Sequence, residues 1–293
     1  MLETAAPPAG AVRCTPAQAA KTYAYLERFV PFEAGPKASV SATFARCCLA
    51  ANPDLELDPA PAAAEAASMA AAALAHPDRA RMDLDPLLLV SCHGVLADAG
   101  FEVGALREML GEVATAFAGL PAPVRELGRV RHIASLLAAR GFGVVVGAAG
   151  REAAELAKSP ARILNAPGDV VADLADHLFA DGAELGEDLT VMLALTALGE
   201  LRNYRVDLGA KLLRLVTSLG RPCLETEEGL NFVALQRRRT GAYGFVNPFL
   251  PPSEDPAELD RGFFLPMTLN AAWLFHTAAA PRRGPTEAAG AGR

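Results

Sequence analysis

The segment DVVADLADHLFAD, residues 169–181, carries the side chains of this sequence best suited to acid–base chemistry. Asp173 and His177 are four residues apart, so a helix places them side by side on one face. The carboxylate can orient the imidazole and raise its pKa, which makes the two a candidate acid–base pair. Because acidic residues also stabilise a helix N-terminus, a structural role is the competing interpretation. Asp207 is a third catalytic candidate. The candidates for binding a substrate are Asp176, Tyr204, Tyr243 and His276.

A second group of chemically capable residues is SCHG, residues 91–94, which resembles the Cys-His-Gly motif of lanthipeptide cyclases. The resemblance implies a helical toroid that holds zinc through Cys92, His93 and a further cysteine, either Cys47 or Cys48. Two thiolates and an imidazole suit zinc and leave a fourth position open for catalysis. The other signatures of the cyclases are missing, and buried cysteines also pack as small apolar residues. No metal or cofactor is therefore predicted, with zinc as the alternative.

Other polar features of the sequence have simpler explanations. His132 and His276 lie in apolar helical segments, where a lone histidine is usually a hydrogen-bonded core residue. The run Arg237-Arg238-Arg239 ends a predicted helix, which indicates a solvated turn, with an anion site as the alternative. The glycines of GFGVVVG, residues 141–147, follow a helix, so this segment predicts a connector rather than a phosphate-binding loop.

Composition excludes several classes of partner. The net charge of −7 and the pI of 5.3 argue against binding of nucleic acid, which requires a concentrated basic face. The five cysteines are odd in number and irregularly spaced, which indicates reduced thiols. The sequence lacks a basic start followed by an apolar stretch, and it has no charge-poor apolar span of membrane length. We therefore expect a cytoplasmic protein that neither crosses nor binds a membrane.

The same composition predicts an all-α fold. Hydrophobic residues make up 52% of the chain, alanine is frequent, and aromatic residues are only 6%. Thr15-Pro16 predicts a helix that begins there and ends before Pro31. Asp169 or Gly168 is expected to open a later helix, and Asp188 and Asp207 are the predicted caps of the next two. The other predicted helices span 38–51, 60–75, 86–99, 103–118 and 122–140. One domain over 14–280 is expected, with mobile tails at 1–13 and 281–293.

The apolar patterns of two successive helices suggest how the domain is layered. Residues 207–219 have one apolar face and one polar face, which is typical of an outer helix. The preceding segment DLTVMLALTALGEL is apolar on nearly every side, so other helices must enclose it. Alternating inner and outer helices predict an α/α-toroid, in which helical hairpins form a ring. A large helical bundle is the alternative.

LNFVALQRRRTGAYGF, residues 230–245, resembles the helix and turn that recur in α/α-toroid proteins such as prenyltransferases and terpene cyclases. In those proteins an apolar helix ends in Leu-Gln, followed by a polar turn and then Gly-aromatic-Gly. The resemblance implies that Gln236 caps the helix end and that Tyr243 packs back between hairpins. It concerns the fold more than the activity.

Most of the chain is similar to an uncharacterised family of bacterial all-helical proteins that often occur beside natural-product genes. Leu178, Phe179 and Asp207 match the family's pattern, whereas the family's histidine falls on Asp176 and its glutamate on Lys211. Either the site is rebuilt around other groups such as His177, or only binding remains. The landmarks that occur in matching order are VPF, DVVADLADHLFADGAELG, NYRVDLGAKLLRLVTSLG, LNFVALQ and GFFLPMTLNAAWLFHTA.

The resemblance and the expected ring of helices together imply a function. A central, mostly apolar cavity would accept a bulky, partly apolar small molecule or peptide. The chain is expected to be an accessory or tailoring protein of a specialised-metabolite pathway, such as a cyclase-like enzyme. The alternatives are a non-catalytic protein that binds a peptide, a metabolite or a partner biosynthetic enzyme, and a purely structural role.

Overall fold

The structure of the chain is a computed structural model that describes residues 14–78, 82–146, 159, 163, 165, 166, 168–181, 185–220, 223–244 and 255–279. Over these residues the fold is all-α without a β-strand, which confirms the predicted class. The tails predicted at 1–13 and 281–293 lie outside the described residues. The longer helices are α1 (Pro16–Glu27), α2 (Pro36–Ala50), α3 (Ala60–Ala75), α4 (Pro86–Asp98), α5 (Gly104–Ala118), α7 (Gly128–Ala139), α10 (Gly168–Asp181), α11 (Glu187–Arg202), α12 (Val206–Leu219), α13 (Leu224–Leu235) and α15 (Leu265–Ala279).

Local signals in the sequence explain where several helices begin and end. Thr15 and Gln18 form a capping box at the start of α1, with Pro16 at the first helical position. Asp85 caps α4 by accepting a hydrogen bond from the N–H of Leu87 at 2.9 Å. Gly141, at φ +82°, follows the last turn of α7 in the left-handed conformation that favours glycine.

Three predicted boundaries are wrong. The helix predicted over 122–140 is interrupted at residues 126–127, which divides it into the short α6 (Ala122–Arg125) and α7. Asp188 and Asp207 do not cap their helices, because Gly186 and Arg205 occupy the N-cap positions. Both aspartates lie in the first turn instead, where the helix dipole favours the same negative charge.

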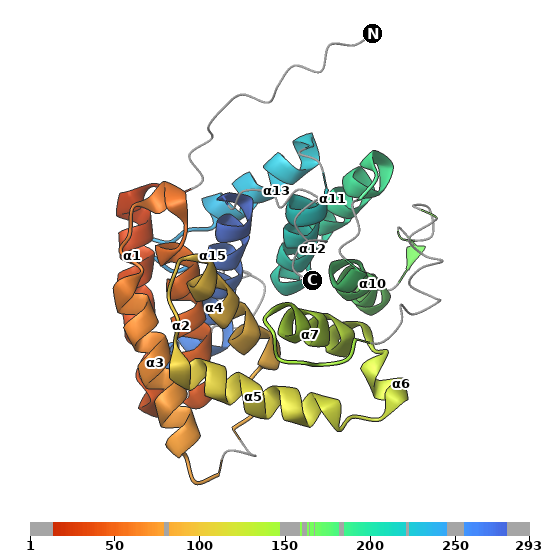
Figure 1. Cartoon of the computed structure of the whole chain (residues 1–293). Coiled ribbons are helices and arrows are strands. Elements are labelled where there is room, and N and C mark those ends of the chain that lie inside the picture. The colour runs from red at the N-terminus through yellow and green to blue at the C-terminus, as the bar shows by residue number, and fades with distance from the viewer. Residues whose placement is uncertain are drawn as a thin grey trace.

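Six helices contact one another in a closed circuit. In order around it, α2 contacts α4, then α7, α10, α12 and α15 follow, and α15 returns to α2. The remaining long helices lie outside this circuit: α1, α3 and α5 beside the N-terminal members, and α11 and α13 beside α12 (Figure 1). The sequence predicted an α/α-toroid from alternating apolar and amphipathic helices, with a large helical bundle as the alternative. The all-α class is confirmed, and the toroid stays a prediction.

The order of the two layers is the reverse of the one predicted. Helix α12 belongs to the circuit, whereas α11 lies outside it and leaves Leu195 46% exposed. The polar face of α12 suggested contact with water, but Lys211 and Arg214 point to partners on other helices. Two polar side chains of this face therefore contact polar side chains on α10 and α15, Asp176 and Asn270.

Buried apolar side chains form two clusters that meet at α15. Helices α1 to α7 supply most of the first cluster, and α10 to α13 supply most of the second. Leu269 of α15 belongs to the first cluster and Leu274 to the second, so this helix joins the two. The other junction is the contact of α7 with α10, where the facing side chains are polar. Among the described residues, no helix has the length and apolar character needed to cross a membrane.

The turn after α13 is locked onto α1 by a close backbone approach. Thr22 donates a hydrogen bond from its hydroxyl to the carbonyl of Gly241 at 2.8 Å. Gly241 has φ +94°, and a Cβ atom there would lie 2.3 Å from the carbonyl oxygen of Lys21. Only glycine fits this position without displacing either the turn or the helix.

Replacing Gly241 with alanine is expected to lower the free energy of unfolding by roughly 2–5 kcal/mol, from left-handed strain and overpacking together. Gly141→Ala is the matched control. Gly141 also has positive φ, but nothing lies within 4 Å of its Cβ position. Urea unfolding should therefore show that this control lowers the free energy of unfolding by only about 1–2 kcal/mol. If both variants lost the same free energy of unfolding, the close approach of Gly241 to α1 would contribute nothing to stability.

Candidate functional site

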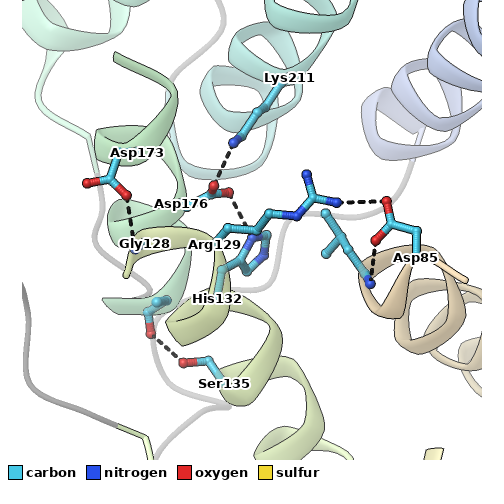
Figure 2. A network of polar contacts seen from close by, with 10 residues as sticks. Asp85, Gly128, Arg129, His132, Ser135, Asp173, Asp176 and Lys211 are labelled. Carbon is cyan, nitrogen blue, oxygen red and sulfur yellow. Dashed lines mark hydrogen bonds and ion pairs between the residues drawn. The ribbon is translucent and has the colours of Figure 1, made fainter. Parts of the chain in front are cut away.

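The junction of α7 and α10 holds a buried network of charged and polar side chains (Figure 2). Asp176 of α10 is its centre and is 3% exposed. One carboxylate oxygen lies 3.1 Å from Nδ1 of His132 on α7, and the other accepts a hydrogen bond from Nζ of Lys211 on α12 at 2.6 Å. Three helices of the circuit therefore meet at one carboxylate.

The surroundings of Asp176 keep it ionised. Burial is the largest single influence and by itself raises the pKa of this carboxyl. The hydrogen bond with His132 and the charge of Lys211 act in the opposite direction, and together they bring the pKa below its ordinary value of 3.8. Lys211 also balances the negative charge and, with 21% of its side chain exposed, is more exposed than the side chains of Asp176 and His132.

The ionised carboxylate determines what His132 can do. A carboxylate accepts a hydrogen bond only from a protonated Nδ1, so this contact favours the tautomer with its proton on that nitrogen. In that tautomer Nε2 carries the lone pair and is the basic nitrogen. A carboxylate that orients an imidazole in this way is the basis of many general acid–base sites.

The acid–base pair expected from the sequence is present, but both members have other partners. Asp173 and His177 are neighbours on α10, with Oδ2 and Nε2 3.7 Å apart, which is beyond hydrogen-bonding distance. Asp173 accepts a hydrogen bond from the backbone N–H of Gly128 at 2.9 Å, which holds the first turn of α7 against α10. Nδ1 of His177 lies 3.3 Å from Nη1 of Arg131, an arrangement in which the guanidinium donates the hydrogen bond and the ring nitrogen accepts it.

Further contacts fix α7 in place around this network. Gly128 lets α10 approach closely, because a Cβ atom there would lie 2.1 Å from a carboxylate oxygen of Asp173. Arg129 pairs with Asp85, the N-cap residue of α4, at 2.7 Å, and Ser135 donates to the carbonyl of Ala180 at 3.5 Å (Figure 2). The position of His132 is thus set by both neighbours of α7 in the circuit.

The other predicted site residues lie apart from this network. Asp207 is exposed in the first turn of α12. Tyr204 has φ +63° and lines a surface pocket of about 240 Å³ with Phe232 and Met267. Tyr243 is buried, with its ring 5.9 Å from that of Phe275, so it packs in the core as the toroid resemblance implies.

His276 lies on α15 and is largely buried. Burial lowers the pKa of its imidazole, although the charge of Asp98 and a hydrogen bond with the backbone of Cys48 act in the opposite direction. Its Nδ1 is buried without a hydrogen-bond partner in the described part of the chain. His276 is therefore a neutral histidine near α2 rather than a member of the α7–α10 network.

The cysteines expected as zinc ligands are buried, and two of them meet. The sulfur atoms of Cys47 and Cys92 are 3.7 Å apart, and their mutual hydrogen bond and burial raise the pKa of the Cys47 thiol well above its usual value. His93 packs against Phe142 instead, with ring centroids 5.9 Å apart. Across the described ranges, no three His, Cys, Asp or Glu side chains are grouped so that they could hold a metal ion.

Sequence reasoning listed Asp176 among the binding candidates but missed its partners. His132 and Lys211 are 44 and 35 residues away from it along the chain, so no local spacing connects them. The resemblance predicted from the sequence would align Asp176 and Lys211 with the family's histidine and glutamate; this alignment stays a prediction, and the structure places the two side chains in contact. Comparisons of the chain with protein-family models, with curated proteins and with solved structures find no match.

Proposed function

We propose that this chain is an accessory or tailoring protein of a specialised-metabolite pathway that binds a bulky, partly apolar substrate and exchanges a proton with it through His132. The hydrogen bond between Asp176 and His132 carries the proposal. Asp176 orients the imidazole through this hydrogen bond, while Lys211 balances the carboxylate charge. This role replaces the pair Asp173 and His177, whose Oδ2 and Nε2 lie 3.7 Å apart, beyond hydrogen-bonding distance.

Three observations support a functional network over a purely structural one. Burying a carboxylate, an ammonium and an imidazole together is costly, and apolar residues of similar volume often stabilise a core as well or better. The side chains of the network come from α7, α10 and α12, three helices of the circuit that are separated along the chain. The contact of Asp176 with Lys211 falls where the resembled family places polar residues, which supports a site rebuilt with other groups.

The experiment that tests the proposal replaces His132 in the host organism. Deletion of the gene should cause a pathway intermediate to accumulate, and the unaltered gene should restore the product. His132→Asn keeps an N–H that can donate to Asp176 but lacks a basic nitrogen, so it should restore less than about 1% of product formation, given the usual contribution of a general base. Product and intermediate are quantified by mass spectrometry of extracts.

The control is Lys37→Gln, which alters a residue of an exposed ion pair on α2, away from the α7–α10 junction. It should restore the product fully. The folded fraction of His132→Asn must match that of the unaltered protein by circular dichroism. Full product formation by the His132→Asn protein would reject proton exchange through this residue.

The alternative is binding without chemistry, and one observation favours it. Both oxygens of Asp176 are occupied by residues of the chain, as expected of a network that holds three helices together. A purely binding protein would show saturable binding of the accumulated intermediate by calorimetry and would return it chemically unchanged. Recovery of an altered ligand would exclude this alternative.

A further inference from the structure

A pocket at the surface lies away from the α7–α10 network. Its volume is about 530 Å³, and it opens between α1, the turn that follows α13 and the π-helical segment Asp260–Phe264. Ala24, Ala242 and Phe264 supply apolar surface. Its charged members are Lys21, Arg28, Arg238 and Asp260.

The cations of this pocket outnumber its single carboxylate. Arg28 pairs with Asp260 at 3.0 Å, and Tyr25 donates a hydrogen bond from its hydroxyl to the other oxygen of Asp260 at 3.3 Å. Asp260 is therefore neutralised locally. Lys21 and Arg238 have no acidic partner within the described part of the chain. The pocket thus carries two uncompensated positive charges in a protein whose net charge is −7.

The two arginines are held in place before any ligand arrives. The guanidinium of Arg238 lies 4.5 Å from the ring centroid of Phe264, and that of Arg28 lies 4.3 Å from the ring centroid of Tyr25. Stacking of this kind leaves the in-plane N–H groups free to donate. The backbone N–H of Arg238 bonds to the carbonyl of Ala242 at 2.7 Å, and the same turn is locked onto α1 at Gly241.

We propose that this pocket binds an organic phosphate, with the phosphate between Lys21 and Arg238 and an apolar or aromatic body against Phe264. A phosphate monoester carries about −1.5 to −2 charges at pH 7, which matches the two free cations. Arginine forms paired hydrogen bonds with phosphate oxygens, and lysine adds a compact charge. This ligand site is independent of the function proposed for His132.

The test uses the full-length protein and three probes: phenyl phosphate, inorganic phosphate and benzoate. Titration calorimetry should show binding in the order phenyl phosphate, then inorganic phosphate, then benzoate, with affinities that fall as salt is added. Lys21→Gln and Arg238→Gln should each weaken binding of phenyl phosphate about tenfold, because each removes a charge-assisted hydrogen bond. The double variant should show no measurable binding.

Arg239→Gln is the matched control, because Arg239 is the exposed neighbour of Arg238 and does not line the pocket. The affinity of the Arg239→Gln protein for phenyl phosphate should stay within about twofold of the affinity of the unaltered protein. The proposal is overturned if the unaltered protein does not bind phenyl phosphate at about 10 mM. It is also overturned if Arg239→Gln weakens binding as much as Arg238→Gln, or if benzoate binds as tightly as phenyl phosphate.

Discussion

Replacing Asp176 with asparagine is expected to lower the free energy of unfolding by about 3 kcal/mol, the lower end of the range for breaking a buried ion pair. The substitution removes the negative charge and leaves one acceptor oxygen, so the amide can accept from only one of the two partners, Lys211 at 2.6 Å or His132 at 3.1 Å. The loss stays at the lower end because 21% of the Lys211 side chain is exposed, so its ammonium can reach water. Urea unfolding monitored by circular dichroism measures the difference.

Two further variants separate the ion pair from general damage. Asp188→Asn removes an exposed carboxylate from the first turn of α11 and should cost less than about 1 kcal/mol. In the double variant Asp176→Asn with Lys211→Met no charge remains unpaired at this place, so the double variant should recover part of the loss. If the two single losses simply added, the contact between the two side chains would contribute nothing to stability.

The effect of Asp176→Asn should depend on pH. The folded protein lowers the pKa of this carboxyl below its ordinary value of 3.8, so its ionisation stabilises the fold at pH values above about 4. As pH falls through the lower, folded pKa, the carboxylate is protonated and that stabilisation is lost. The difference between the unaltered protein and Asp176→Asn should therefore be constant from pH 5 to 7 and shrink below about pH 4. A difference that grows on acidification would contradict this sign.

Much of the helical scaffold could be predicted from the sequence because its signals are local. The capping box at Thr15 and the prolines at positions 16 and 86 each act within one turn, so the chain carries them wherever the helix packs. Helix α3 begins and ends at the predicted residues, 60 and 75, because a proline start and a proline stop bracket an alanine-rich segment. Local composition thus determined the elements but not their arrangement.

The candidate site could be predicted only in part, because it is assembled from three helices. Spacing along α10 identified Asp173 and His177 as neighbours, which they are, but it could not reveal that Gly128 and Arg131 engage them. The partner of Asp176 is on α7, and His132 looked like an isolated histidine of an apolar helix. Charge periodicity reports which residues share a face, and only tertiary contacts decide what that face meets.

The pair of Arg46 and Glu65 is the clearest case of a buried interaction that no sequence pattern predicted. Arg46 lies on α2 and is 4% exposed, and its guanidinium donates two hydrogen bonds to the carboxylate of Glu65 on α3. A third hydrogen bond runs from Nη1 to the carbonyl of Tyr23 at 2.6 Å, and the guanidinium lies 3.5 Å from the centre of the Tyr23 ring. One side chain therefore links α1, α2 and α3.

Arg46→Met is accordingly expected to lower the free energy of unfolding by about 3–5 kcal/mol, because it leaves Glu65 without its partner at a largely buried position. Arg46→Lys keeps the charge but cannot form the paired hydrogen bonds, so its loss should be about half as large. The matched control is Arg202→Met, which breaks an exposed pair with Glu228 and should cost less than about 1 kcal/mol. Since both methionine variants remove one arginine from an ion pair between two helices, only burial and the contacts to Tyr23 distinguish them. Equal losses in urea unfolding would mean that these contacts do not stabilise the junction of α1, α2 and α3.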